Sequence, residues 1–170
     1  MILRILDYPH ASLATPTVPV SAADFGTEAL LADMTDMNET MLARGGAGLA
    51  ANQVGLTRSI FAMRSAPGGH GPDAVKMAIN PEVVAHGPMV LGKEACLSFR
   101  SVTWDVYTPT WIKVRYRDED GALREERVDG FGARVFWHES RHLFGRTMLD
   151  SMSSMQRSMF LRAVAKAGRP

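Results

Sequence analysis

The sequence lacks the features that define several protein classes. It has one cysteine, Cys96, which excludes an internal disulfide framework and leaves a free thiol that persists best in a reducing compartment. No apolar run approaches the roughly 20 residues of a membrane span. The start of the chain, residues 1–7, is charged too early for a secretory signal. These absences predict a cytoplasmic protein that does not associate with membranes.

The sequence also has almost no excess of one charge and no phosphate-binding loop. Its 19 Lys and Arg residues nearly balance 18 Asp and Glu residues, so nothing indicates specific nucleic-acid binding. The glycine-rich segment 45–53 lacks the Gly-Lys-Ser/Thr ending of a nucleotide loop and follows no obvious strand. Its glycines and alanines instead favour close approach of another backbone, as in a groove for an extended peptide.

Hydrophobic periodicity predicts an α+β fold. An amphipathic helix is expected over 24–43, where four apolar residues recur at helical spacing; methionines at that spacing are core filler more often than a metal or partner surface. The helices 130–144 and 155–166 follow a run of strands, and this segregation favours α+β over alternating units. With a loop at 65–72 and no change in composition, residues 1–170 are predicted to form a single domain. The expected strands are 60–63, 75–79, 83–91, 102–107, 111–117 and 123–128.

The helix expected at 130–144 contains the most informative motif, His138-Glu139-Ser140-Arg141-His142. Two imidazoles four residues apart on a helix point the same way and can bind one metal ion, and the glutamate between them is the usual general base. A third ligand can come from elsewhere, and Cys96 lies on a segment that a strand can bring to the helix. The alternative is a solvated helix with two unrelated histidines.

Three motifs in this order, Gly46–Gln53, Glu94–Ser98 and His138–His142, resemble the signature motifs of the peptide deformylases. The resemblance covers roughly residues 2–150. It implies an antiparallel or mixed sheet packed around a central metal-binding helix, with an N-terminal and a C-terminal helix. It also implies one divalent metal ion per chain, Fe²⁺ natively, with Zn²⁺, Ni²⁺ or Co²⁺ as substitutes. The implied reaction removes the N-formyl group from the N-terminal methionine of nascent peptides.

The resemblance also implies roles for individual residues. Cys96, His138 and His142 match the metal ligands, and Glu139 matches the general base. Gln53 and the backbone N–H of Leu97 match the donors that stabilise the oxyanion. Ala47 and Gly48 would pair with the peptide backbone, and Phe131 and Val135 would line the methionine pocket, although plain core packing is an alternative for these last two. The basic tail is expected to be a solvated helix face, with a transient ribosome contact as the alternative.

Five residues depart from the family's pattern near the site: Ala95, Arg100, Thr103, Trp137 and Arg141. Ala95 stands where the family has glycine, and Arg100 stands where a proline is common. None is a ligand or the base, but they alter the surroundings on which metal affinity and substrate placement depend. We therefore expect reduced activity on formyl-Met peptides. Two alternatives stay open: a deformylase-like paralogue that hydrolyses another acyl or peptide amide, and a non-catalytic module that binds N-terminal peptides. The sequence leaves the oligomeric state unknown.

Overall fold

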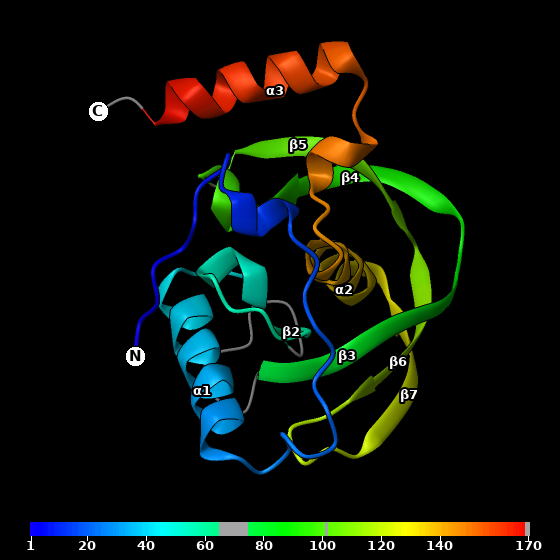
Figure 1. Cartoon of the computed structure of the whole chain (residues 1–170). Helices are drawn as coiled ribbons and strands as arrows, with labels where there is room; N and C mark the ends of the chain where they lie inside the picture. The colour runs from blue at the N-terminus through cyan, green and yellow to red at the C-terminus, as the bar shows by residue number, and fades with distance from the viewer. Residues whose placement is uncertain (65–74, 101, 169–170) are drawn as a thin grey trace.

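A computed structural model describes residues 1–64, 75–100 and 102–168. These residues form three helices and seven strands, which make an α+β fold (Figure 1). Short 3₁₀ turns at Ala11–Ala14, Ala51–Val54, Leu97–Phe99 and Met148–Ser151 connect them. The helices are α1 (Glu28–Ala43), α2 (Gly130–Leu143) and α3 (Ser154–Ala167); the strands are β1 (Gly48–Ala50), β2 (Ile60–Arg64), β3 (Val75–His86), β4 (Met89–Ala95), β5 (Thr103–Pro109), β6 (Trp111–Arg117) and β7 (Leu123–Asp129).

The strands form two sheets. Five of them pair in the order β1-β2-β3-β6-β7, and β4 pairs with β5 in a separate two-stranded sheet. Every strand pair among the described residues is antiparallel, so of the two arrangements expected, antiparallel and mixed, the structure has the first. The turn between β6 and β7 contains Gly121 at φ 80°, a backbone conformation that glycine adopts without steric cost.

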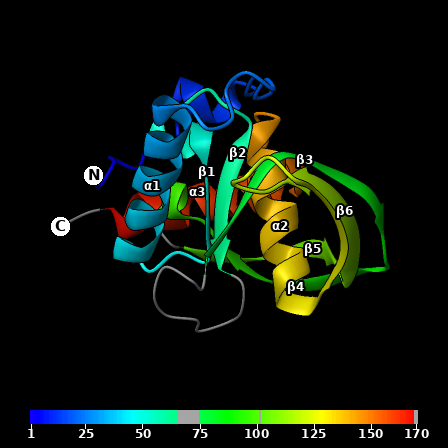
Figure 2. The ribbon, with the colours of Figure 1, turned by 90° about the horizontal axis from the view of Figure 1, so that it is seen from below.

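Helix α2 lies between the sheets. Figure 2 shows α1 and α2 on opposite sides of strands β1 and β2, with β4 and β5 beyond α2. Apolar residues from both sides of the large sheet, such as Met37 and Phe136, join one buried cluster. Helix α3 packs over β5 through Phe160, whose ring lies 5.6 Å from Trp104 and 5.3 Å from Phe99. Within the described ranges, no helix has the length and apolar character needed to cross a membrane.

The sequence predicted α1 and its buried face. Thr27 caps the helix by accepting a hydrogen bond from the Leu30 N–H, which explains why it begins at Glu28 and not at residue 24. The recurring apolar residues are Leu30, Met34, Met37 and Met41, and each is at most 6 % exposed. The interpretation of the methionines as core is therefore confirmed.

Two strand predictions differ from the structure. Residues 75–79 and 83–86 belong to one strand, β3, which continues through a register shift near Asn80, and β4 begins only at Met89. Asn80 has a positive φ of 51°, and such an irregularity lets a strand bend without ending. No strand was predicted from the sequence at Gly48–Ala50, where the structure has β1. The predicted loop at 65–72, which includes His70, lies outside the described residues.

Candidate metal centre

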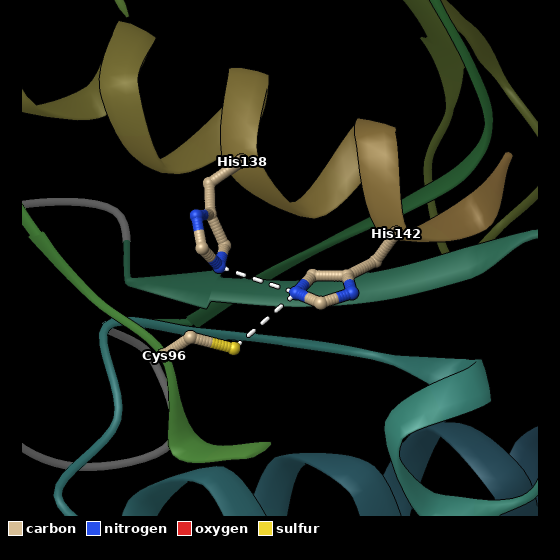
Figure 3. Close-up of side chains that lie close together, drawn as sticks. All are labelled: Cys96, His138 and His142. Atoms are coloured by element: carbon tan, nitrogen blue, oxygen red, sulfur yellow. Dashed lines mark hydrogen bonds between the residues drawn. The ribbon is translucent and has the colours of Figure 1, made fainter. Parts of the chain in front are cut away.

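Cys96, His138 and His142 converge at one point. The Cys96 Sγ atom lies 3.3 Å from His142 Nε2, which lies 3.2 Å from His138 Nε2 (Figure 3). Their candidate ligand atoms all lie within 4.8 Å of one another, and no other such cluster of three occurs among the described residues. The structure thus brings together the three residues that the sequence predicted as ligands.

Two elements position these side chains. His138 and His142 lie one turn apart on α2, so their rings share a face of the helix. Cys96 follows the last residue of β4 and precedes the 3₁₀ turn Leu97–Phe99, with an extended backbone. The carbonyl of His142 accepts a hydrogen bond from the Asn52 side-chain amide, which ties the end of α2 to the turn after β1. Both the thiol and the His142 ring are buried.

Glu94 orients one of the two imidazoles. Its Oε2 lies 2.9 Å from His138 Nδ1, which directs Nε2 of the same ring toward Cys96 and His142. Burial opposes charging of His138, but hydrogen bonds to Cys96 and Glu94 raise its pKa well above the ordinary value. Burial lowers the pKa of His142 well below the ordinary value, and charge on His138 acts the same way. The sequence motif contained Glu94, but no role had been predicted for it.

The donor set fits a divalent metal ion. A thiolate and two imidazoles around one ion in a tetrahedron would lie about 3.3–3.7 Å apart, close to the separations seen here. The Nε2 atoms of His138 and His142 face each other, so at most one proton can lie between them. The Cys96 Sγ atom lies beside the same Nε2 atom of His142. A soft thiolate with imidazole favours Zn²⁺, Fe²⁺ or Co²⁺ over Mg²⁺ or Ca²⁺.

Glu139 is buried beside this cluster. Its side chain is buried, and its Oε2 has no hydrogen-bond partner among the described residues. Burial raises the pKa of this carboxyl to about 7, and the nearby Glu94 adds to the shift, while His138 opposes it. A carboxyl whose pKa lies near neutrality can both accept and return a proton. This environment is compatible with the predicted role of Glu139 as a base, which stays a prediction.

Gly48 of β1 provides the space for Glu139. A Cβ atom added at Gly48 would lie 2.6 Å from Cγ and 2.7 Å from Cδ of that glutamate. Carbon atoms do not approach this closely, so a side chain at residue 48 would displace the carboxylate. The glycine requirement here comes from contact with the glutamate and not from backbone conformation.

We expect Gly48→Ala to lower kcat by about 10²-fold while leaving the metal content near that of the wild type. A displacement of about 1 Å at a reacting group can have an effect of this size, and the three atoms nearest to the added methyl group all belong to Glu139. Formate release and elemental analysis on the same sample measure both quantities. Ala29→Ser, at an exposed alanine of α1 outside the pocket lining, is the control, and equal losses in the two variants would contradict the displacement.

Gln53 and Leu97 lie on two further sides of the cluster. Gln53 Oε1 accepts from the Ala50 N–H at 2.8 Å, and its Nε2 lies 3.4 Å from Cys96 Sγ and 3.1 Å from Ser98 Oγ. These contacts hold the amide N–H₂ group at the metal centre. Leu97 begins a 3₁₀ turn, so its N–H has no partner within the turn. Ser98 was part of the motif, but its contact with Gln53 was not predicted.

A pocket of about 340 Å³ opens onto this centre. Four predicted substrate-binding residues line it: Ala47, Gly48, Phe131 and Val135. Phe131 is 46 % exposed, so plain core packing is wrong for this residue, whereas Val135 both lines the pocket and joins the core cluster. Sequence reasoning missed three cations in the lining, Arg44, Lys93 and Arg134. The last lies one turn before His138 on the same helix face, a spacing that could have indicated it.

The five residues that depart from the family's pattern lie in different parts of the structure. Ala95 and Thr103 are cross-strand partners, and both line the pocket. Trp137 packs against the larger core cluster, and Arg141 donates to the Thr147 carbonyl at 3.4 Å after the end of α2. Arg100 closes the 3₁₀ turn at a positive φ of 57°. Proline, whose φ is restricted to about −65°, cannot adopt that conformation.

Comparisons with known proteins agree on one family. The family model described as Polypeptide deformylase matches residues 2–158. The chain is 35 % identical over 166 residues to the peptide deformylase of Aquifex aeolicus, covering 98 % of this chain and 96 % of that protein. It is 31 % identical over 170 residues to a peptide deformylase-like protein of Agrobacterium fabrum, covering 99 % of each. The crystal structure of a peptide deformylase from Legionella pneumophila superposes with a TM-score of 0.89 at 27 % identity, covering 100 % of both chains.

Proposed function

This chain belongs to the polypeptide deformylase family, and we propose that it hydrolyses the formyl amide of N-formylmethionyl peptides. The observation that carries the proposal is the presence of Glu139 beside the Cys96, His138 and His142 cluster at the base of one pocket. The residues proposed as ligands, base and groove thus lie together, which supports the proposal. A non-catalytic binding module would not need a buried carboxyl whose pKa lies near neutrality.

Cys96, His138 and His142 would hold the metal ion, with Glu94 orienting His138. When bound, a divalent cation polarises a carbonyl group and makes water more acidic. As the resemblance to the family implies, the native ion in this proposal is Fe²⁺, with Zn²⁺, Ni²⁺ or Co²⁺ able to replace it, and thiolate and imidazole donors suit all of these ions.

Glu139 would take a proton from the attacking water as the new C–O bond forms at the formyl carbon. It would then return that proton to the amine nitrogen as the C–N bond breaks, so the products are formate and a free amine. The N–H groups of Gln53 and Leu97 would donate to the formyl oxygen as it gains negative charge. One such donor is typically worth about 3–4 kcal/mol in the transition state.

The pocket would receive the methionine and the peptide that follows it. Phe131 and Val135 supply apolar surface for the methionine side chain, and Ala47 and Gly48 would pair with the peptide backbone as an added strand. We further propose that residues 1–170 form one domain that works in the cytoplasm on nascent chains. A transient ribosome contact through the basic residues of α3 belongs to the same proposal.

Formate release from formyl-Met-Ala-Ser by protein purified without oxygen tests the function. We expect one formate per free amine produced, and no release after the metal is removed with a chelator. A paralogue acting on another amide would show itself as turnover of acetyl-Met-Ala-Ser, with none of the formyl peptide. A binding module would bind either peptide without releasing acid.

The residues that depart from the family's pattern predict a kcat/KM on formyl-Met peptides below the common range of about 10⁴ M⁻¹s⁻¹. Ala95→Gly is the sharpest test, because Ala95 lines the pocket beside Cys96, and Arg100→Pro would break the turn. We expect Ala95→Gly to raise kcat/KM by up to about 10²-fold. A wild-type value already in the common range, and unmoved by the substitution, would show that this position is neutral.

A further inference from the structure

Charge is distributed unevenly around the pocket. Its two carboxylates, Glu94 and Glu139, are 7 % and 5 % exposed and lie at the metal centre. The three cations in the lining, Arg44, Lys93 and Arg134, are partly or fully accessible to solvent. No exposed carboxylate lines the pocket, so the part of the groove that a peptide would meet carries positive charge only.

These cations differ from those on the large sheet. There, Lys113 and Arg115 pair with Glu125, and Arg124 pairs with Asp118. None of the three pocket cations has an ion pair within the described ranges of the chain. Lys93 lies opposite Asp105 in the β4-β5 register, but no ion pair joins them. Because Asp105 offsets the charge of Lys93, Arg44 and Arg134 are the cations most available to an acidic ligand.

Arg134 is held in place before any ligand arrives. Its Nε donates to Thr108 Oγ1 at 3.2 Å, and its Nη1 donates to the Lys93 carbonyl at 3.1 Å. Thr108 is fully buried. The guanidinium lies against Gly92, where an added Cβ would approach its Cζ to 2.7 Å. A partly buried guanidinium with neutral partners only is preorganised for a carboxylate, which it can bind through two parallel hydrogen bonds.

We propose that Arg134, assisted by Arg44, selects formylated peptides with an acidic side chain at the residues after methionine. The arginines come from different elements: Arg134 from α2, beside β4, and Arg44 from the end of α1, just before the segment that would pair with the peptide. A peptide lying along Ala47 and Gly48 would therefore occupy a pocket that receives cations from two separate elements. This inference rests on the proposed function, because the peptide must first be a substrate.

Rates on C-terminally amidated peptides test the proposal, because the amide removes the terminal carboxylate. The isosteric pairs are formyl-Met-Glu-Ala-amide with formyl-Met-Gln-Ala-amide, and formyl-Met-Ala-Glu-amide with formyl-Met-Ala-Gln-amide. At low salt, we expect a kcat/KM ratio of about 3–10 in favour of glutamate in at least one pair, the size expected for accessible ion pairs. In 1 M salt, where the screening length is about 3 Å, the ratio should fall toward 1.

Substitutions of the two arginines distinguish an effect of charge from an effect on the structure. Arg134→Gln should bring the ratio close to 1, Arg134→Lys should keep most of it, and Arg44→Gln should lower it partly. Arg162→Gln, which removes an exposed cation of α3 outside the pocket lining, should leave it unchanged. If Arg134 bound only a peptide carbonyl, the variant would slow all peptides equally and the ratio would persist, which would overturn the proposal. If the wild-type protein released formate at equal rates from the two peptides of each pair, the proposal would also be overturned. No release from any peptide would instead refute the proposed function.

Discussion

Glu139→Gln is expected to lower kcat by at least about 10²-fold while the protein retains its metal. The amide has the same shape as the carboxyl but cannot accept the proton of the attacking water. Glu139 is adjacent to His138 in sequence, yet it is not one of the three clustered donors, so metal binding should survive its replacement. Formate release measures the rate, and elemental analysis of the same sample measures the metal.

Glu119→Gln is the matched control for this substitution. Glu119 is exposed in the turn between β6 and β7, so removing its charge should change neither quantity. Loss of metal together with activity in Glu139→Gln would contradict the assignment, since the glutamate would then support the site and not the proton transfer. An unchanged rate in this variant would refute the general-base role itself.

The elements with strong periodicity were predictable from the sequence. The apolar stripe of α1 and the alternating residues of β6 determine their elements locally, and the structure has both where the pattern indicated them. Strand β1 has three residues, too few to show any period, and it exists because it pairs with Phe61–Met63 of β2. Likewise, the continuity of β3 depends on its pairing with β2 and β6, which no local pattern reports.

The metal cluster was predictable because helical spacing alone places His138 and His142 together, and a recognised motif supplied Cys96. The role of Glu94 had a local signal, since residues two apart in a strand share a face and Glu94 precedes Cys96 by two. The pocket cations Arg44 and Arg134 had a weaker local signal. Arg134 and Arg44 lie ninety residues apart in the sequence, and only the tertiary fold brings α2 and the end of α1 to one pocket.

Cys96→Ser is expected to reduce bound metal from about one ion per chain to a small fraction of that value. The substitution keeps the shape of the side chain but removes the thiolate, one of three donors. Loss of even an outer partner of a ligand typically costs 10–100-fold in affinity, so loss of the ligand itself should cost more than about 10²-fold. Elemental analysis of both proteins after dialysis against metal-free buffer measures the difference.

Thermal unfolding gives an independent measurement of the same site. Because an ion that binds only the folded state stabilises it, a chelator should lower the Tm of the wild type and leave that of Cys96→Ser nearly unchanged. His86→Ala is the matched control: His86 contacts the Trp137 ring and lies outside the cluster, so this variant should keep its metal and its response to the chelator. Normal metal content in Cys96→Ser, or a wild type that carries only Mg²⁺ or Ca²⁺, would contradict the ligand set, because those ions prefer oxygen donors to a thiolate.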